Sequence, residues 1–153
     1  MNLYEILNEL NIKYDEIEHD AVYTVEEANR IESMIEGIGC KNLFLTDKNK
    51  YFLYVLKDDK RADLKELSKY LNVLRLSFGN EDKLMELLGL TKGSVTPLGI
   101  INDKDNKVTI ILDKDLVNCK LLCHPNTNTK TMNIEYEDLI KLIEYTNHKY
   151  IIY

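Results

Sequence analysis

Two apolar stretches lie close together in the chain, Leu43-Phe44-Leu45 and Tyr51-Phe52-Leu53-Tyr54-Val55-Leu56, separated by the polar segment Asp47-Lys48-Asn49-Lys50. Their length and their aromatic and branched residues are typical of β-strands, and the polar segment is typical of a turn. Because apolar residues occupy both faces of each stretch, we expect a central hairpin that is covered on both sides. The rest of the fold is expected to build on this hairpin.

Helices and further strands are predicted on both sides of the hairpin. Asn2 with Glu5, and Thr24 with Glu27, match the capping-box pattern that opens a helix. Caps and apolar spacing predict helices after Asn2, Thr24, Asp63 and Asn80 and over Tyr136–Tyr145. Strands are expected over Lys13–His19, Leu74–Phe78, Leu98–Ile101, Val108–Leu112, Lys120–Cys123, Thr129–Asn133 and Tyr150–Tyr153, with Leu98–Ile101 and Val108–Leu112 forming a hairpin.

Strands in hairpins with interspersed helices indicate a mixed sheet with helices packed against it. We therefore expect a single domain over residues 1–153, of α/β class, with a mixed, mostly antiparallel central β-sheet and surrounding helices. Strict alternation of strand and helix is absent, as are the glycine-rich GxGxxG and GxxxxGK[ST] patterns, so a Rossmann fold or P-loop is not expected.

Composition is that of an ordinary soluble domain, with 44% hydrophobic and 30% charged residues. No apolar run approaches the ~20 residues that span a bilayer, and the first residues lack the character of a secretion signal. We expect a cytoplasmic protein without a membrane partner. The net charge of −6 argues against a general DNA or RNA binder but does not exclude a protein that grips one end of an RNA.

The chain contains three cysteines and no CxxC pair. This pattern gives neither a disulfide framework nor a zinc knuckle. We expect no metal and no cofactor.

Three short segments carry the chemistry that a site would need. They are Lys41-Asn42 before an apolar strand, the turn Gly93-Ser94-Val95-Thr96-Pro97, and the run Cys123-His124-Pro125-Asn126-Thr127-Asn128. Each places polar groups where a strand begins or ends, where ligand contacts often gather. If the segments converge, they offer a cation, backbone N–H groups, and an imidazole beside carboxamides. That set suits a polar ester attached to a nucleotide better than a metal or a phosphate alone.

Each segment also has a plain structural reading. Glycine and proline at the ends of the 93–97 turn favour a nest of N–H groups that polarises a carbonyl, or simply a connector. His124 is either a catalytic imidazole or a structural one, and Asn126 and Asn128 either fix its tautomer or bind a ribose hydroxyl. Lys41 is either a phosphate-binding cation or an exposed surface lysine.

Taken in order, these segments resemble the YbaK/prolyl-tRNA synthetase-associated editing domains. The family pattern is lysine-asparagine before an apolar strand, then Gly-x-x-x-Pro, then His-Pro-x-x-Asn followed by threonines. Here it reads Lys41-Asn42, Gly93 to Pro97, and His124-Pro125-Asn126-Thr127-Asn128 with Thr129 and Thr131. The similarity covers essentially the whole chain and is greatest to the free-standing ProX (PrdX-type) deacylases, which hydrolyse alanine from tRNA(Pro).

The resemblance implies a trans-editing hydrolase for Ala-tRNA(Pro) that acts on the aminoacyl ester of the terminal adenosine. Lys41 would contact the phosphate or ribose of that adenosine, and Asn42 and His124 would orient substrate and water. The backbone from Gly93 through Ser94, Val95 and Thr96 to Pro97 would line the acyl pocket, with Val25 and Ala28 as further wall candidates. Many relatives carry a histidine shortly before the lysine, where this chain has Gly39 and Cys40. A covalent role for Cys40 is not expected, because nothing in the sequence supplies a base beside it.

The implied partner is the 3′ acceptor end of tRNA(Pro), with prolyl-tRNA synthetase as a further candidate partner and a monomer as the expected state. Two alternatives remain open. One is a deacylase of the same family for Cys- or Ser-tRNA, because pocket volume depends on packing. The other is a non-catalytic module that senses an amino acid or an aminoacyl-tRNA.

Overall fold

The central hairpin predicted from the sequence is present in the computed structural model, which describes residues 1–153. Strands β2 (Cys40–Thr46) and β3 (Tyr51–Lys57) pair antiparallel, from Cys40 opposite Lys57 to Thr46 opposite Tyr51. Five consecutive residues of β3, Phe52–Leu56, are buried, so both faces of this strand are covered as expected.

The hairpin belongs to a five-stranded sheet in the order β4-β2-β3-β5-β8, and a separate three-stranded sheet has the order β1-β7-β6. Pairs in the small sheet and the β2–β3 and β2–β4 pairs are antiparallel, whereas β3–β5 and β5–β8 are parallel. The mixed α/β class is therefore confirmed. The remaining elements are α1 Leu3–Glu9, β1 Glu16–Glu18, α2 Val25–Glu32, α3 Leu64–Tyr70, β4 Ser77–Phe78, α4 Glu81–Leu88, η1 Lys92–Ser94, η2 Pro97–Asn102, β5 Val108–Leu112, η3 Lys114–Leu116, β6 Lys120–Cys123, β7 Lys130–Glu135, α5 Tyr136–Tyr145 and β8 Tyr150–Ile152.

The predicted hairpin of residues 98–101 and 108–112 is wrong. Residues 97–102 form the 3₁₀ helix η2, because Pro97 fixes a helical φ at its first position and Thr96 accepts a hydrogen bond from the Leu98 N–H. Strand β5 instead pairs parallel with β3, placing Tyr51 opposite Val108. The strand expected over 74–78 shrinks to Ser77–Phe78, and Leu74 is fully exposed.

All four predicted N-caps are present. The side chains of Asn2, Thr24, Asp63 and Asn80 each accept a hydrogen bond from the backbone N–H three residues later. Such caps satisfy N–H groups that have no partner inside the helix. They fix where α1, α2, α3 and α4 begin.

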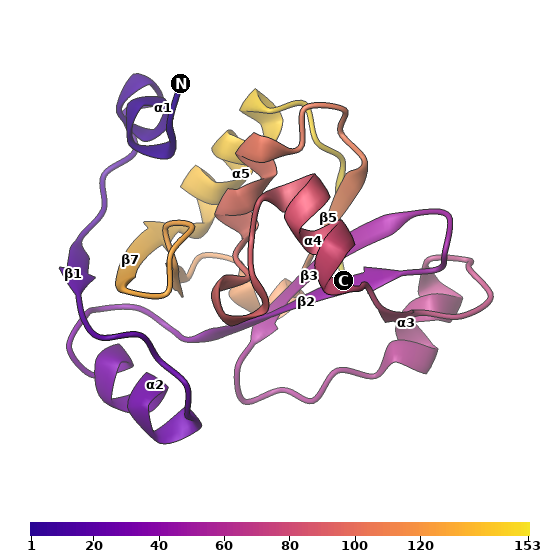
Figure 1. Ribbon diagram of the computed structural model, residues 1–153, viewed down its shortest axis with the longest axis horizontal. Helices are drawn as coiled ribbons and strands as arrows, with labels where there is room; N and C mark the ends of the chain where they lie inside the picture. Colours follow the sequence, from indigo (N-terminus) through magenta and orange to yellow (C-terminus); the bar gives the residue numbers. More distant parts are fainter.

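The five-stranded sheet has a core on each face. The larger cluster, of 26 buried residues, joins α1, α4, α5 and the three-stranded sheet to one face, and the smaller one, of seven, joins α3 to the other. Figure 1 shows α3 at one end of the long axis and α2 at the other end, near β1. The two sheets touch through a bridge between Ile38 and Leu121. No helix is both long and apolar enough to cross a membrane.

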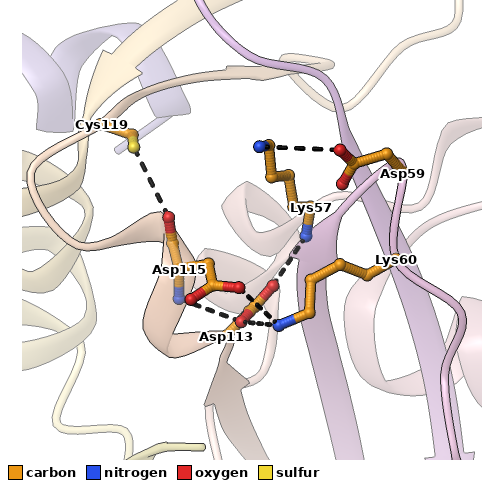
Figure 2. Close-up of polar contacts among 6 residues, drawn as sticks. All are labelled: Lys57, Asp59, Lys60, Asp113, Asp115 and Cys119. Atoms are coloured by element: carbon orange, nitrogen blue, oxygen red, sulfur yellow. Dashed lines mark hydrogen bonds and ion pairs between the residues drawn. The ribbon is translucent and has the colours of Figure 1, made fainter.

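A buried carboxylate ties the ends of β3 and β5 together (Figure 2). The fully buried Asp113 accepts bonds from the Lys57 backbone N–H at 3.1 Å, the Lys60 Nζ at 2.7 Å and the Asp115 N–H at 3.0 Å. Burial alone would raise the pKa of Asp113, but these three donors outweigh it and hold the pKa below its ordinary value. The carboxylate thus stays charged and clamps the chain that leaves β3.

Candidate active site

A cavity of about 240 Å³ opens between α2, the start of β2 and the edge of the three-stranded sheet. Segments far apart in the sequence meet there, because β2 belongs to the large sheet and residues 122–131 to the small one. Its walls are formed by Val22, Ala28, Ile31, Glu32, Cys40, Asn42, Lys92, Gly93, Val95, Leu122, Cys123, His124 and Thr131.

Asn42 is the most informative polar group in this wall. Its Oδ1 atom is buried and has no hydrogen-bond partner in the protein. A buried polar atom without a partner costs about 1–3 kcal/mol, so native structures seldom retain one without a reason. Because Asn42 also lines the cavity, a ligand that donates a hydrogen bond would complete it.

Gly93 and Val95 bring the 93–97 segment to the cavity, as the sequence predicted. The N–H of Val95 makes no backbone or side-chain hydrogen bond within the protein and is free to bind a carbonyl oxygen. Gly93 does not have a positive φ, so the argument from glycine's backbone freedom fails here. A β-carbon there would lie 3.5 Å from Asn128 Nδ2, an ordinary contact distance, so the space around Gly93 does not require glycine either.

The other three residues of the segment hold the loop rather than line the cavity. Ser94 is buried and its N–H and hydroxyl bond to Thr91, while Thr96 is fully buried and caps η2. Pro97 is buried as the first residue of η2. Ser94, Thr96 and Pro97 therefore shape the turn that presents Gly93 and Val95.

His124 lines the cavity with a defined tautomer. Its Nδ1 lies 2.9 Å from the Lys130 carbonyl oxygen, which can only accept, so Nδ1 carries the proton. Burial lowers the pKa of His124, the Lys130 bond partly opposes this, and the neighbouring His19 lowers it further. The imidazole is therefore neutral at pH 7, with a free lone pair on Nε2.

A second histidine, His19, lies beside the first and was not predicted as a site residue. The rings of His19 and His124 are 6.4 Å apart. His19 Nδ1 donates to the Asp20 carbonyl at 2.8 Å, so its Nε2 accepts from the hydroxyl of Thr131, also at 2.8 Å. This chain of bonds fixes Thr131, which lines the cavity next to His124.

Asn126 and Asn128 lie in the turn behind His124 and do not line the cavity. Asn126 takes the left-handed conformation with φ 62°, which asparagine tolerates better than most residues. Asn128 donates from Nδ2 to the Val22 carbonyl at 3.1 Å and so ties the turn to the segment before α2. Both keep a buried Oδ1 without a partner, as Asn42 does.

Lys41 does not reach the cavity, contrary to the expectation that its ammonium joins the other groups. Strand alternation puts Lys41 on the face of β2 that carries Leu43 and Leu45, opposite the face of Asn42. Its exposed Nζ donates to the Lys60 carbonyl at 2.5 Å and forms no ion pair. Lys92, from η1, is the lysine that lines the cavity, and a phosphate contact by Lys41 stays a prediction.

Of the two wall residues expected from α2, only Ala28 lines the cavity. Val25 is 78% exposed and does not line it, because the residues that open α2 are exposed. Ile31 and Glu32, one turn further on, complete this wall.

The two cavity thiols are poor nucleophiles. Burial raises the pKa of Cys123 to about 12, and burial with the nearby Cys123, Asp58 and Glu32 raises the pKa of Cys40 further above its ordinary range. Only a thiolate attacks carbonyls well, so both act as small wall residues. The structure contains no group of three or more His, Cys, Asp or Glu side chains placed to hold a metal ion.

Comparison with known proteins agrees with this geometry. The family model described as the aminoacyl-tRNA editing domain matches residues 19–142. The chain belongs to the aminoacyl-tRNA editing domain family. It is 43% identical to the prolyl-tRNA editing protein ProX of Acetoanaerobium sticklandii, over 90% of this chain and 86% of that protein. It is 40% identical to the prolyl-tRNA synthetase associated domain-containing protein 1 of Danio rerio, over 98% of this chain and 84% of that protein.

The fold of this editing domain also matches solved structures. A crystal structure of a candidate trans-editing enzyme for prolyl-tRNA synthetase aligns with a TM-score of 0.71, covering 98% of this chain and 94% of that one. The identity is 19%, so this likeness concerns the fold alone.

Of the residues predicted from motifs, Asn42, Gly93, Val95 and His124 line this cavity, and their roles in binding or catalysis stay predictions. Glu32 and Lys92 line the cavity but belong to no motif, whereas Thr131 is one of the threonines that follow His-Pro-x-x-Asn and was given no role. The Lys92 position next to Gly93 gave a usable signal, because a residue adjoining a predicted ligand loop is itself a candidate. Glu32 comes to the cavity through long-range packing, which spacing along the chain does not reveal.

Proposed function

We propose that this protein is a trans-editing hydrolase that removes alanine from mischarged Ala-tRNA(Pro). The proposal rests on one observation above all: the unpartnered Asn42 lies in the same small cavity as Gly93, Val95 and the neutral His124. Membership of the aminoacyl-tRNA editing family and similarity to a ProX editing protein support the same reaction.

The reaction is hydrolysis of the ester between the amino acid and the ribose of the terminal adenosine. A water molecule adds to the ester carbonyl, the carbon–oxygen bond to the ribose breaks, and the ribose oxygen takes up a proton. An aminoacyl ester is already activated, so positioning and a few donors to the carbonyl oxygen supply much of the required acceleration. No covalent enzyme intermediate is needed.

Three groups of the cavity divide this work. The free Val95 N–H polarises the carbonyl oxygen, and the Nε2 lone pair of His124 accepts a hydrogen bond from the attacking water or a vicinal ribose hydroxyl. Asn42 supplies both an acceptor and donors that hold the ribose and the ester in place.

Substrate choice follows from size. A synthetase pocket shaped for proline cannot strongly reject the smaller alanine, because a missing methylene is worth only about 1–3 kcal/mol. A second site that admits alanine and excludes the bulkier proline ring corrects the error. The cavity of about 240 Å³ is small enough for its walls, including Ala28 and Ile31, to impose such a limit.

Positive charge for the tRNA end comes from two lysines. Lys92 lines the cavity, and Lys41 is an exposed lysine without an ion-pair partner on the opposite face of β2. We assign to Lys92 the contact nearest the ester and to Lys41 a contact with a backbone phosphate outside the cavity. The proposal also includes a cytoplasmic monomer that meets the 3′ acceptor end of tRNA(Pro), with docking to prolyl-tRNA synthetase as an added prediction.

Deacylation of Ala-, Cys-, Ser- and Pro-tRNA(Pro) by the purified protein tests the proposal. We expect Ala-tRNA(Pro) to be hydrolysed fastest and Pro-tRNA(Pro) to be spared, with Lys41→Ala and Lys92→Ala each lowering kcat/KM. Faster hydrolysis of Cys- or Ser-tRNA(Pro) would reassign the substrate within the family. Failure to hydrolyse any of the four would favour a non-catalytic sensor instead.

A further inference from the structure

Glu32 is the one carboxylate in the cavity wall, and its surroundings disfavour a negative charge. It is the last residue of α2, where the helix end already carries partial negative charge. The carboxyl groups of Glu32 and Asp58 converge on the buried Gly39, where a β-carbon would collide with both. Burial and the adjacent Asp58 carboxylate raise the pKa of Glu32.

No cation of the protein compensates this pair. Neither Glu32 nor Asp58 takes part in an ion pair, although Lys57 close by in the sequence pairs with Asp59 at 3.6 Å. Partly buried acidic groups are usually stabilised by a paired cation or by hydrogen bonds. A cation that enters the cavity would relieve the repulsion between the two carboxylates and the helix end at once.

We propose that Glu32, backed by Asp58, binds the α-ammonium group of the aminoacyl moiety. This inference rests on the proposed function, because an aminoacyl ester places an ammonium one carbon from its scissile carbonyl. The cavity then matches both charges of its ligand, with Glu32 for the ammonium and Lys92 for the phosphate side. Asn42, two residues beyond Cys40 on the same face of β2, lines the same cavity.

A consequence is selectivity for free aminoacyl groups. An ester whose amino group is acylated, as in peptidyl-tRNA, has no positive charge to offer Glu32. The enzyme would then remove misactivated amino acids and spare tRNAs that carry a growing peptide.

The test compares Ala-tRNA(Pro) with lactyl-tRNA(Pro), in which a hydroxyl replaces the ammonium at nearly the same volume. We expect Glu32→Gln to lower kcat/KM for the alanyl ester at least tenfold and to change that for the lactyl ester less than twofold. Glu26→Gln is the matched control, because it removes the same charge from an exposed position of α2 and should leave both substrates unchanged.

The outcomes separate the two claims. Equal losses on both esters would mean that Glu32 only supports the cavity wall, and no loss on either would mean that it does not touch the substrate; both results overturn this inference while the deacylase stands. A wild-type protein that hydrolyses neither ester would overturn the proposed function and this inference with it.

Discussion

Among single residues, the buried asparagines differ in whether their side chains have hydrogen-bond partners inside the protein. Asn42 and Asn133 are both asparagines at the junction of the sheets, but Asn133 accepts from the Asp15 N–H at 2.7 Å and donates to the Glu36 carbonyl at 3.0 Å. Asn42 makes neither kind of bond inside the protein. A residue kept for function should cost stability, and a residue kept for structure should supply it.

Replacing Asn42 with alanine should therefore reduce activity without reducing stability. We expect kcat/KM for Ala-tRNA(Pro) to fall about 10²-fold, because misplacing the ester by loss of a positioning group carries effects of that size. The melting temperature should stay the same or rise, because an unpartnered buried oxygen is removed. In the control, Asn133→Ala should lower the free energy of unfolding by about 1–3 kcal/mol. A clear loss of stability in Asn42→Ala would refute the distinction.

The lowered pKa of His124 predicts how activity declines on the acid side of the pH–rate profile. Burial and His19 hold its pKa below the ordinary 6.5, so Nε2 keeps its lone pair until the pH falls below that value. We expect kcat/KM to decline on the acid side with an apparent pKa below 6.5, and this decline to vanish in His124→Asn, whose residual activity is low. An acid limb that persists unchanged in the variant would assign it to another group.

The same shift affects folding. Because the folded pKa of His124 is lowered, the unfolded chain takes up the proton first as the pH falls through about 6.5. Its contribution to stability is therefore present at neutral pH and lost toward acid. Urea unfolding at several pH values should show a shallower decline in His124→Asn.

Among the helices, α2 forms one wall of the cavity, and its inner and outer faces can be tested separately. Ala28 faces the cavity, whereas its neighbour Asn29 is exposed. Ala28→Leu should fill part of the space for the acyl group and lower turnover of Ala-tRNA(Pro) at least tenfold, with little change in stability because no packed side chain is displaced. Asn29→Leu should leave kcat/KM within twofold. Equal activity of the two variants would exclude α2 from the acyl pocket.

The clamp at the ends of β3 and β5 is the second element-scale feature. Removing the charge of the buried Asp113 in Asp113→Asn should lower the free energy of unfolding at pH 7 by about 1–3 kcal/mol, a range that allows for solvent screening of the partly exposed Lys60. The lowered pKa means that this contribution is present above pH 3.8 and lost as the pH falls further, so the variant should be less acid-sensitive. Asp59→Asn, which breaks only the exposed pair with Lys57, should have little effect (Figure 2).

At the scale of the whole molecule, local patterns predicted the pieces better than their arrangement. Caps and the β2–β3 hairpin depend on neighbours in sequence, and they were predicted correctly. The parallel pairing of β5 with β3 depends on residues more than 50 positions apart, and the polar turn before Val108 suggested a local hairpin instead. The spacing of residues within a short segment does not determine which distant strand it pairs with.

The residues of the candidate site were likewise only partly predictable from the sequence. Asn42, Gly93, Val95 and His124 were predicted because their motifs repeat a family pattern. Lys41 was expected to join these groups but does not line the cavity, and because both faces of β2 are apolar, alternation did not indicate which side holds it. Glu32 reaches the cavity through long-range packing of α2 near the place where the two sheets meet at Ile38 and Leu121, which no short motif reveals.

The central claim is that one cavity between the two sheets binds an aminoacyl group on an adenosine. Nuclear magnetic resonance titration with 3′-deoxy-3′-(L-alanylamino)adenosine, whose amide resists cleavage, tests it most directly. We predict saturable shifts of the Asn42 side-chain amide, the Gly93 and Val95 N–H groups and the His124 ring. Shifts confined to other surfaces, with these four groups unmoved at saturation, would contradict it.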